Sequence, residues 1–408
     1  MDERIDMLIV GGGLVGPALA LAAASAGLRV RVLDAAPAAA LADPEFDGRA
    51  YAVAAASRRM LRALGLWAGI EGAAQPILQV KVSDGVAGRG AAPLFAHFDA
   101  DELGEGPLGH IVEDRFLRRA LLAAMAESPL VTVETGARVI GQAEVPGGVE
   151  VTLADGTTRC ARLLVGADGR GSQVARRAGI GRTEWAYRQT SLVAALEVER
   201  PHEGIAQQMF FPDGPLAILP LTGNRVSIVW TEDTTRAAAV QAMDDDGYLA
   251  ALRPCFGDFL GQIRLAGKRY AYPLGLSLAT RITAPRLALA GDAAHGIHPL
   301  AGQGLNLGLR DVATLAQVLA EAHRRGEDIG AADVLERYRR WRQFDIAALA
   351  TATDAINRVF SNANPLLRLG RTLALGAIEA APALRRRLMR EAMGTAGDLP
   401  VLLQGRAL

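Results

Sequence analysis

The chain has little cysteine: Cys160 and Cys255 are its two thiols among 408 residues, and they form neither a CxxC pair nor a disulfide framework. That scarcity fits a reducing compartment, so we expect a cytoplasmic protein. Net charge is also missing, because 44 basic residues balance 44 acidic ones. A nucleic-acid partner would favour a strongly basic domain, so the composition gives no reason to expect one.

Long uncharged runs are scarce as well. Residues 8–28 are the one stretch long enough to suggest a membrane span or a signal peptide. The residues before this stretch are mostly acidic, which is wrong for a signal peptide, and the glycines and Pro17 near its start would weaken a spanning helix. We therefore expect a globular chain, whose length predicts two or more lobes.

The same stretch predicts a strand at 6–10, a helix to about Ala26 and a second strand at 29–33. Its turn contains Gly11-x-Gly13-x-x-Gly16, where glycines permit a tight turn, close approach of a pyrophosphate and close packing of the helix on the strand. Asp34 lies 21 residues after Gly13, where an acid can accept hydrogen bonds from a ribose. The pattern indicates an ADP-containing cofactor without separating FAD from NAD, and a glycine-rich helical hairpin is the alternative.

Two further segments lie near residue 300. Gly291-Asp292 follows a predicted strand at 286–290, where open α/β sheets bind ligands, although a turn aspartate is an equal explanation. Gly302-Gln-Gly304-Leu305-Asn306 opens a long helix, and a helix start favours negative charge. His295 and His298 are three residues apart, but with no further ligands nearby they indicate hydrogen bonding within the loop and no metal site.

The rest of the chain changes character twice. Short apolar runs between 188 and 231 alternate with turn residues, which is typical of antiparallel sheet. We expect helices at 53–64, 113–126 and 235–252, and a helical region after 305 that is broken near Pro365 and Pro382.

These motifs resemble a known family. The run from Gly291 to Asp311 is similar to the flavin signature of class A flavoprotein monooxygenases, Gly166-Ala-Asp168-Gly169 resembles their second conserved loop, and Gly48-Arg49 resembles their flavin-contacting arginine segment. Within that superfamily the segments 189–193, 211–221 and 227–230 resemble the ubiquinone-biosynthesis hydroxylases. The family often has glutamate where this chain has Asp34, so the chain departs from the usual pattern at the ribose contact by one shorter side chain.

The resemblance implies an α/β fold with a discontinuous Rossmann-like FAD-binding domain made of residues 1–70, 95–187 and 270–330. An antiparallel β-sheet substrate domain of residues 71–94 and 188–269 would be inserted in it, and residues 331–408 would form a C-terminal helical region. The residues expected to hold FAD are Gly11, Gly13, Gly16, Asp34, Arg49, Arg115, Asp168, Gly169, Gly291, Asp292, Gly302, Gly304, Leu305 and Asn306. Candidate walls of a substrate pocket are Leu219, Pro220, Trp230 and Pro299, for which core packing is an equal explanation.

The implied activity is hydroxylation of the phenolic ring of a prenylated ubiquinone precursor through a C4a-hydroperoxyflavin, with NAD(P)H and O2 as co-substrates. The same chemistry on a soluble aromatic or polyketide-like substrate is one alternative, and a non-enzymatic flavin-binding accessory subunit is another. No catalytic acid or base is identified, and neither the ring carbon nor the nicotinamide cofactor is specified. A homo-oligomer or a biosynthetic complex is compatible with this reading.

The C-terminal region adds one hypothesis. From Asn364 to Met393 there are six arginines and two glutamates, and leucines recur among them. A basic amphipathic helix can lie on an anionic membrane, which predicts peripheral contact with the inner face of a membrane. Helices packed on the body with solvated arginines explain the pattern equally well.

Overall fold

A computed structural model describes residues 5–45, 48–86, 90–297, 302–360 and 365–408. Its first core is a sheet built around β1 (Met7–Val10), whose side chains are nearly all buried. β1 pairs in parallel with β2 (Val30–Asp34) on one side and with β12 (Leu163–Gly166) on the other. Strands covered on both faces are expected to be continuous apolar runs, as β1 and β12 are, whereas β2 contains Arg31 and ends at Asp34. Within the described residues the sheet has six strands, in the order β19 (Thr283–Ala284), β20 (Leu287–Leu289), β12, β1, β2 and β8 (Val131–Thr135).

Helix α1 (Val15–Ser25) follows β1 directly and packs against α8 (Gln303–Arg324) and α4 (Asp114–Glu127). The contact with α8 is close, because a Cβ on Gly308 would lie 2.8 Å from the side chain of Val15. The uncharged run at 8–28 is thus a strand, a turn and a helix. Among the residues that the structure describes, no helix combines the length and the hydropathy that a membrane crossing needs.

The second core belongs to a larger sheet. Its strands are β5 (Gln79–Val86), β6 (Gly90–Asp99), β13 (Arg182–Val198), β14 (Ile205–Phe211), β15 (Gly214–Leu221), β16 (Arg225–Asp233), β17 (Ile263–Leu265), β18 (Tyr270–Ala279) and β21 (His295–Gly296). Its pairs are antiparallel except for β14 with β5. The sheet therefore draws strands from both sides of the boundaries expected at 94/95, 187/188 and 269/270. The antiparallel sheet predicted from 188 to 231 is confirmed.

Two helices occupy the region in which one helix was expected. α6 (Thr234–Gln241) and α7 (Asp245–Phe256) replace a single helix at 235–252. The side chain of Asp244 accepts a hydrogen bond from the amide of Gly247 at 2.8 Å, and this N-cap begins the second helix. Both helices pack over one face of the large sheet, where Trp230 and Tyr248 are buried edge to face.

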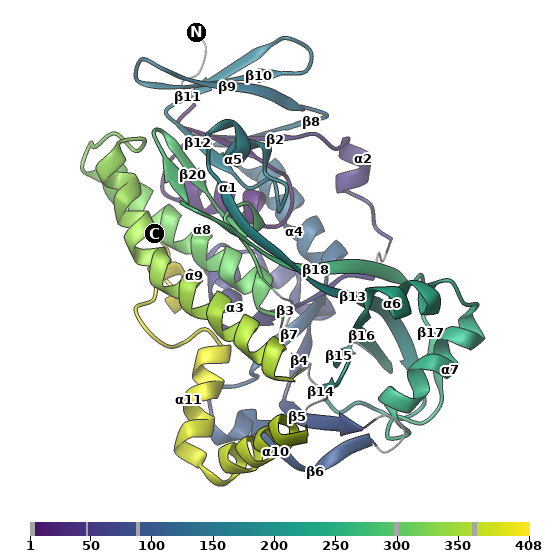
Figure 1. The fold of residues 1–408 in the computed structure, drawn as a ribbon. Helices are drawn as coiled ribbons and strands as arrows, with labels where there is room; N and C mark the ends of the chain where they lie inside the picture. Colours follow the sequence, from purple (N-terminus) through teal and green to yellow (C-terminus); the bar gives the residue numbers. More distant parts are fainter. Residues whose placement is uncertain (1–4, 46–47, 87–89, 298–301, 361–364) are drawn as a thin grey trace.

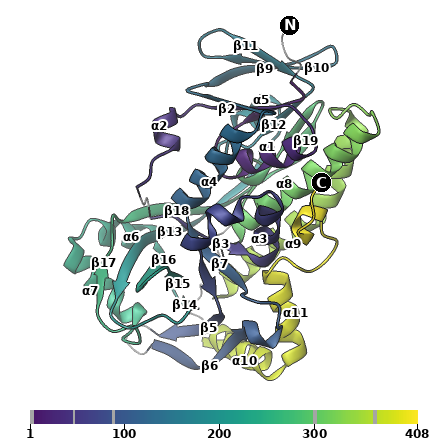
Figure 2. The same ribbon diagram turned by 180° about the vertical axis from the view of Figure 1, so that it is seen from behind.

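Two smaller sheets complete the strands. β9 (Val139–Val145), β10 (Gly148–Leu153) and β11 (Thr158–Ala161) form one, and β3 (Ala50–Ala54), β7 (Gly109–Glu113) and β4 (Gln75–Ile77) form the other. The helix expected at 53–64 is α3 (Ala55–Ala63), because the residues before it belong to β3. β3 and β7 lie between the two large sheets in both views (Figure 1, Figure 2).

The last part of the chain is helical, as expected. α9 (Ala332–Phe360) is followed by α10 (Pro365–Ala380) and α11 (Pro382–Ala392). Both breaks occur at proline, which has no amide hydrogen to donate and is tolerated in the first turn of a helix. α10 packs on β5 and β6, so α10 and α11 lie beside the large sheet and far from the N-terminus, whereas α9 runs along α8 (Figure 1, Figure 2). The α/β fold with an antiparallel sheet and a C-terminal helical region is confirmed.

Candidate functional site

The first part of the site is the glycine turn between β1 and α1. Gly11 has a φ of +119°, and a Cβ there would lie 2.3 Å from the carbonyl oxygen of Ala167. A Cβ on Gly16 would lie 1.9 Å from the carbonyl oxygen of Gly11, so close packing of helix and turn requires glycine at both positions. Gly13 differs, because a Cβ there would meet no atom within 4 Å and would project into a cavity that Gly13 lines.

The amino end of α1 faces the same space. Its N-cap residue, Leu14, makes no side-chain capping hydrogen bond, and no acidic residue lies in the first turn. Unsatisfied amides and the helix dipole make such an end a binding site for a phosphate. Asp34 stands behind the turn: its carboxylate accepts hydrogen bonds from the amides of Gly12 and Ala36, so it holds the turn in place.

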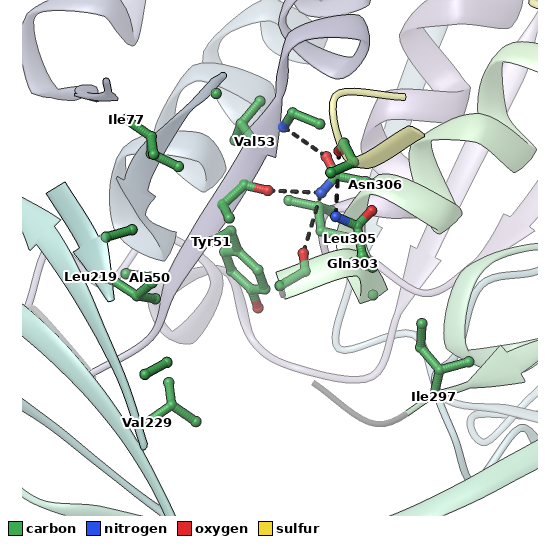
Figure 3. Close-up of a pocket in the computed structure, with 18 of the residues that line it drawn as sticks. Ala50, Tyr51, Val53, Ile77, Leu219, Val229, Ile297, Gln303, Leu305 and Asn306 are labelled. Carbon is green, nitrogen blue, oxygen red and sulfur yellow. Dashed lines mark hydrogen bonds between the residues drawn. The ribbon is translucent and has the colours of Figure 1, made fainter. Parts of the chain in front are cut away.

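The cavity has a volume of about 840 Å³ and lies between the parallel sheet, β3 and the large antiparallel sheet. It brings together three stretches that are distant in the sequence: the glycine turn, the end of β20 and the start of α8. The expected site residues that line it are Gly13, Arg49, Gly169, Asp292, Gly302, Gly304, Leu305, Asn306 and Leu219. Figure 3 shows the meeting of β3, the start of α8 and the large sheet.

The start of α8 is fixed to β3 by Asn306. Its amide oxygen accepts hydrogen bonds from the amide of Ala54 at 2.9 Å and from the hydroxyl of Ser57 at 2.8 Å. Its amide nitrogen donates to the carbonyl oxygens of Ala52 and Gly302 (Figure 3). The side chain is thus fully used within the protein. Gly302 is left-handed, with a φ of +62°, and Gly304 leaves open space beside the helix start.

A charged cluster lies where β3 meets α4. Asp114 is 3% exposed, and its Oδ2 accepts from Arg118 at 2.8 Å and from Arg49 at 3.4 Å. Its Oδ1 is buried and has no hydrogen-bond partner within the described chain. Burial and the nearby carboxylate of Asp114 raise the pKa of Tyr51 above its ordinary value, so the phenol stays protonated. An orphaned carboxylate oxygen in a cavity wall suits a hydroxyl-rich ligand.

Arg115, which was expected near the cofactor, is held outside the cavity wall. Its guanidinium pairs with Glu113 at 2.7 Å and donates to the carbonyl oxygen of Pro44, and it is not among the residues that line the cavity. Arg118 occupies the cavity wall instead. Residues four apart lie on one helix face, whereas a neighbour is turned by about 100°, so Asp114 and Arg118 face the cavity together. The four-residue spacing of Asp114 and Arg118 was therefore the sequence pattern that could have identified Arg118 as a cavity residue.

Asp292 lies at the end of β20 and lines the cavity. Its Oδ2 lies 3.4 Å from Nε of Arg170, and both side chains are about half exposed (46% and 43%). Asp168 plays another part: its carboxylate accepts hydrogen bonds from Ser172 and from the amides of Gln173 and Val174 at the start of α5 (Gln173–Arg177). Asp168 is absent from the cavity wall, to which Gly169 and Arg170 belong.

Behind Asp292 lies a buried ionic network. Nε2 of His295 is 2.6 Å from Oδ2 of Asp311, which also accepts from the amide of Gly291 at 2.9 Å. Oδ1 of Asp311 pairs with Arg342 at 2.7 Å. Gly291 is thus held from behind and does not line the cavity. His295, expected to bond within the loop, is instead paired with Asp311 of α8, while His298 lies outside the described residues. No cluster of metal ligands occurs in the described part of the chain.

Only some of the predicted walls of the substrate pocket line the cavity, because successive side chains of a strand point to opposite faces of the sheet. Leu219 lines the cavity with Ala217 and Pro215, but Pro220 points to the other face of β15 and is not in the wall. Trp230 was also misplaced: it is 1% exposed and packs in the core under α6 and α7, while its neighbours Val229 and Thr231 line the cavity. Pro299 lies outside the described residues.

The cavity has an apolar part that runs over the large sheet. Its walls include Ile77, Val80, Val82, Phe98, Leu108, Phe210 and Val229, and it reaches residues of α11. The charged residues, among them Arg49, Asp114 and Asp292, gather at the other end, while Gln207, Gln208 and Thr231 add polar groups to the part over the large sheet. One continuous space therefore joins a site for a phosphate-bearing, hydroxyl-rich ligand to a site for an apolar one.

Comparison with known proteins agrees with this geometry. Residues 4–353 match the FAD binding domain family. The ubiquinone hydroxylase UbiL of Rhodospirillum rubrum is 46% identical over 97% of this chain and 90% of its own length, and the 3-demethoxyubiquinol 3-hydroxylase of Escherichia coli is 37% identical over 96% and 99%. The solved structure of p-nitrophenol 4-monooxygenase PnpA from Pseudomonas putida superposes with a TM-score of 0.80 at 19% identity, covering 98% of this chain and 100% of that one, and supports the fold alone.

The fold and the cavity define an FAD-dependent monooxygenase. The chain belongs to the class A flavoprotein monooxygenase family, in the branch that contains the ubiquinone hydroxylases.

Proposed function

We propose that this protein hydroxylates the ring of a prenylated phenol in ubiquinone synthesis, with NAD(P)H and O2 as co-substrates. The observation that carries the proposal is the single cavity with a polar and an apolar part. The relatives' names point the same way, since one is a ubiquinone hydroxylase and another a 3-demethoxyubiquinol 3-hydroxylase. A soluble, polar aromatic substrate would not need the apolar part.

The residues at the polar end fit FAD. Gly13 leaves open space at an uncapped helix start, which suits a pyrophosphate, and Asp34 lies behind that turn. Asp292 and the orphaned oxygen of Asp114 suit the hydroxyls of the ribityl chain, with Arg49 and Arg118 balancing the charge. The start of α8 would favour negative charge on a reduced flavin ring. When bound, FAD supplies hydride acceptance, reaction with O2 and oxygen transfer to the phenol.

The protein's own contribution is orientation and exclusion of water. Apolar side chains from β5, β14, β15 and β16 form the walls around the ring site, so a phenol there would be shielded from solvent. Tyr51 projects toward this space from β3 (Figure 3). Because its pKa is raised, it remains a hydrogen-bond donor at neutral pH and can orient a phenolic oxygen.

The decisive experiment is substrate-stimulated NAD(P)H oxidation by the purified, FAD-loaded protein, with ¹⁸O2 to label the product. We expect a prenylated phenol to stimulate oxidation and to gain one labelled hydroxyl. Stimulation by polar aromatics alone would favour the soluble-substrate alternative. Flavin binding without stimulation by any phenol would favour an accessory subunit, and a colourless protein that refuses FAD would contradict the proposal.

We also propose peripheral membrane contact through α10 and α11. Leu373 is 57% exposed on α10, and Arg386 and Arg387 are exposed on α11. Within the described residues no carboxylate lies in ion-pair distance of these two arginines, so both are available to anionic lipid. Changing both to glutamate should reduce co-sedimentation with anionic liposomes. Arg62→Glu with Arg176→Glu, which changes the charge equally at exposed sites elsewhere, should not.

A further inference from the structure

The cavity wall includes one turn and a half of α11. Leu388, Met389, Ala392 and Met393 all contribute to it. Met389 and Met393 are buried, at 3% and 1% exposure, whereas Leu388 is 37% exposed. Leu388 thus lines the cavity and keeps accessible surface beside Arg387 and Arg390, whose side chains are exposed. The apolar part of the cavity therefore reaches the surface of the protein at this side chain.

Two ion pairs hold the rim on either side of Leu388. Arg385 pairs with Glu102 at 2.9 Å, and Arg390 approaches Glu105 at 3.4 Å. Both glutamates lie in the segment that joins β6 to β7, and this segment ends next to Leu108, another cavity residue. The opening therefore lies between α11 and the 98–108 segment. Arginine side chains lie at its outer rim, and apolar side chains line its inner wall.

The volume limits what the cavity can enclose. Cavities of about 300–1,000 Å³ hold one drug-sized ligand. The 840 Å³ here must accommodate the flavin ring and the phenol ring together. An isoprenoid tail of several units adds a long, flexible apolar chain, for which little enclosed space remains. Such a tail has to leave the cavity, and the apolar route out passes α11.

We propose that the isoprenoid tail of the substrate leaves the cavity past Leu388, so that its far end lies outside the protein. This inference rests on the proposed function and specifies the path of that substrate. The near isoprene units contact Leu388 and Met389, while the remainder lies outside the protein, where lipid can take it up. The protein then selects for the presence of a tail and does not measure its full length.

The test uses two neighbouring leucines. Leu388→Trp should partly fill the opening, and Leu384→Trp is its matched control, because Leu384 is 44% exposed one turn earlier on α11 and is not in the cavity wall. FAD-loaded proteins in detergent would be compared on phenols that share one ring and carry no, one or several isoprene units. The measured quantity is the ratio of kcat/KM for the long-tailed phenol to that for the tail-less phenol.

We expect Leu388→Trp to lower this ratio roughly tenfold, as loss of one or two buried methylene contacts would. Leu384→Trp should keep the wild-type ratio. An unchanged ratio in Leu388→Trp would overturn the portal while leaving the proposed function intact. No turnover of any prenylated phenol by the wild-type protein would overturn both.

A second measurement is independent of turnover. In a Cys160→Ser background, which removes the exposed native thiol, Leu388→Cys and Leu384→Cys would be treated with a thiol reagent. A long-tailed substrate should slow labelling at position 388 by a larger factor than a tail-less one, and should leave position 384 unaffected. Equal protection by both ligands at position 388 would show that the tail takes another route.

Discussion

The side chains of His295 and Asp311 are paired at 2.6 Å with no solvent exposure, and this pair connects β21, which follows the Asp292 segment, to α8. Arg342 from α9 completes the network on the other carboxylate oxygen of Asp311. The segment that presents Asp292 to the cavity is therefore anchored by charges that water cannot screen. Two of the three stretches that meet at the cofactor site depend on this one carboxylate.

We expect Asp311→Asn to destabilise the fold by about 3–5 kcal/mol, because it removes the buried carboxylate charge that pairs with Arg342 and His295 and leaves Arg342 with the less buried Asp345. Urea unfolding would measure this. Glu336→Gln is the control: Glu336 pairs with Arg339 and Arg340 at the surface, and the change should leave the free energy of unfolding nearly unchanged. Similar losses of unfolding free energy in both variants would show that the buried network stabilises the fold no more than a surface ion pair does.

The same carboxylate predicts acid sensitivity. Burial by itself would raise the pKa of Asp311, but pairing with His295 and Arg342 outweighs burial and holds the pKa below its ordinary value. A carboxyl group whose pKa falls on folding stabilises the protein above its unfolded-state pKa and loses that contribution as the pH falls through the folded-state value. Asp311→Asn should therefore flatten the acidic limb of stability against pH. An unaltered acidic limb would contradict this.

His110 predicts a second pH effect in a higher range. Burial and the nearby Arg58 lower the pKa of this 7% exposed side chain to about 4. The unfolded chain binds a proton near pH 6.5 while the folded chain does not, so stability is complete above pH 6.5 and declines as the pH falls toward 4. The loss amounts to about 3 kcal/mol at most. His110→Gln should remove this slope in urea titrations between those pH values, and a persisting slope would assign it to other groups.

Substitutions at two glycines of the turn should separate an effect on folding from an effect on FAD binding. A side chain at Gly13 meets open cavity space, so we expect Gly13→Val to fold normally and to lose FAD binding, since valine would occupy the place of the pyrophosphate. A side chain at Gly16 meets the backbone of Gly11, so Gly16→Val should lower the melting temperature severely. Thermal unfolding and FAD titration measure the two effects. Normal FAD affinity in Gly13→Val would place the pyrophosphate elsewhere.

Asp292→Ala should weaken FAD retention by roughly ten- to a hundredfold, because a charged acceptor for the ribityl hydroxyls is lost. The carboxylate is about half exposed and has one ion-pair neighbour, Arg170, so the fold itself should be little affected. Dialysis followed by flavin absorbance would measure retention. Full occupancy after dialysis would remove Asp292 from the cofactor site.

Substitutions of Val229 and Trp230 would test whether successive side chains of β16 face the cavity and the buried core in turn. Trp230→Ala should destabilise the protein by about 3–5 kcal/mol and leave phenol binding unchanged, because Trp230 is buried away from the cavity. Val229→Trp should do the reverse, since it fills the cavity from the wall. Urea unfolding and substrate titration of the FAD-loaded proteins would show whether the two effects separate in this way.

Much of this protein was determined by short stretches of sequence. Gly11, Gly13 and Gly16 act through the backbone of a single turn, so their spacing alone predicted a strand, a turn and a helix. The helix breaks at Pro365 and Pro382 could also be predicted from single residues, because proline has no amide hydrogen to donate in any surroundings.

The tertiary structure decided what local patterns leave open. Whether Arg115 or Arg118 reaches the cavity depends on which face of α4 is turned inward, and whether Val229 or Trp230 reaches it depends on which side of the large sheet α6 and α7 cover. Both alternatives have the same residue types and nearly the same positions in the sequence. The participation of α11 in the cavity wall could not be anticipated at all, because it depends on this helix lying beside a segment far earlier in the chain, as the pairing of Arg385 with Glu102 shows. Contacts of that range are set by the mutual fit of whole elements, and no local pattern encodes them.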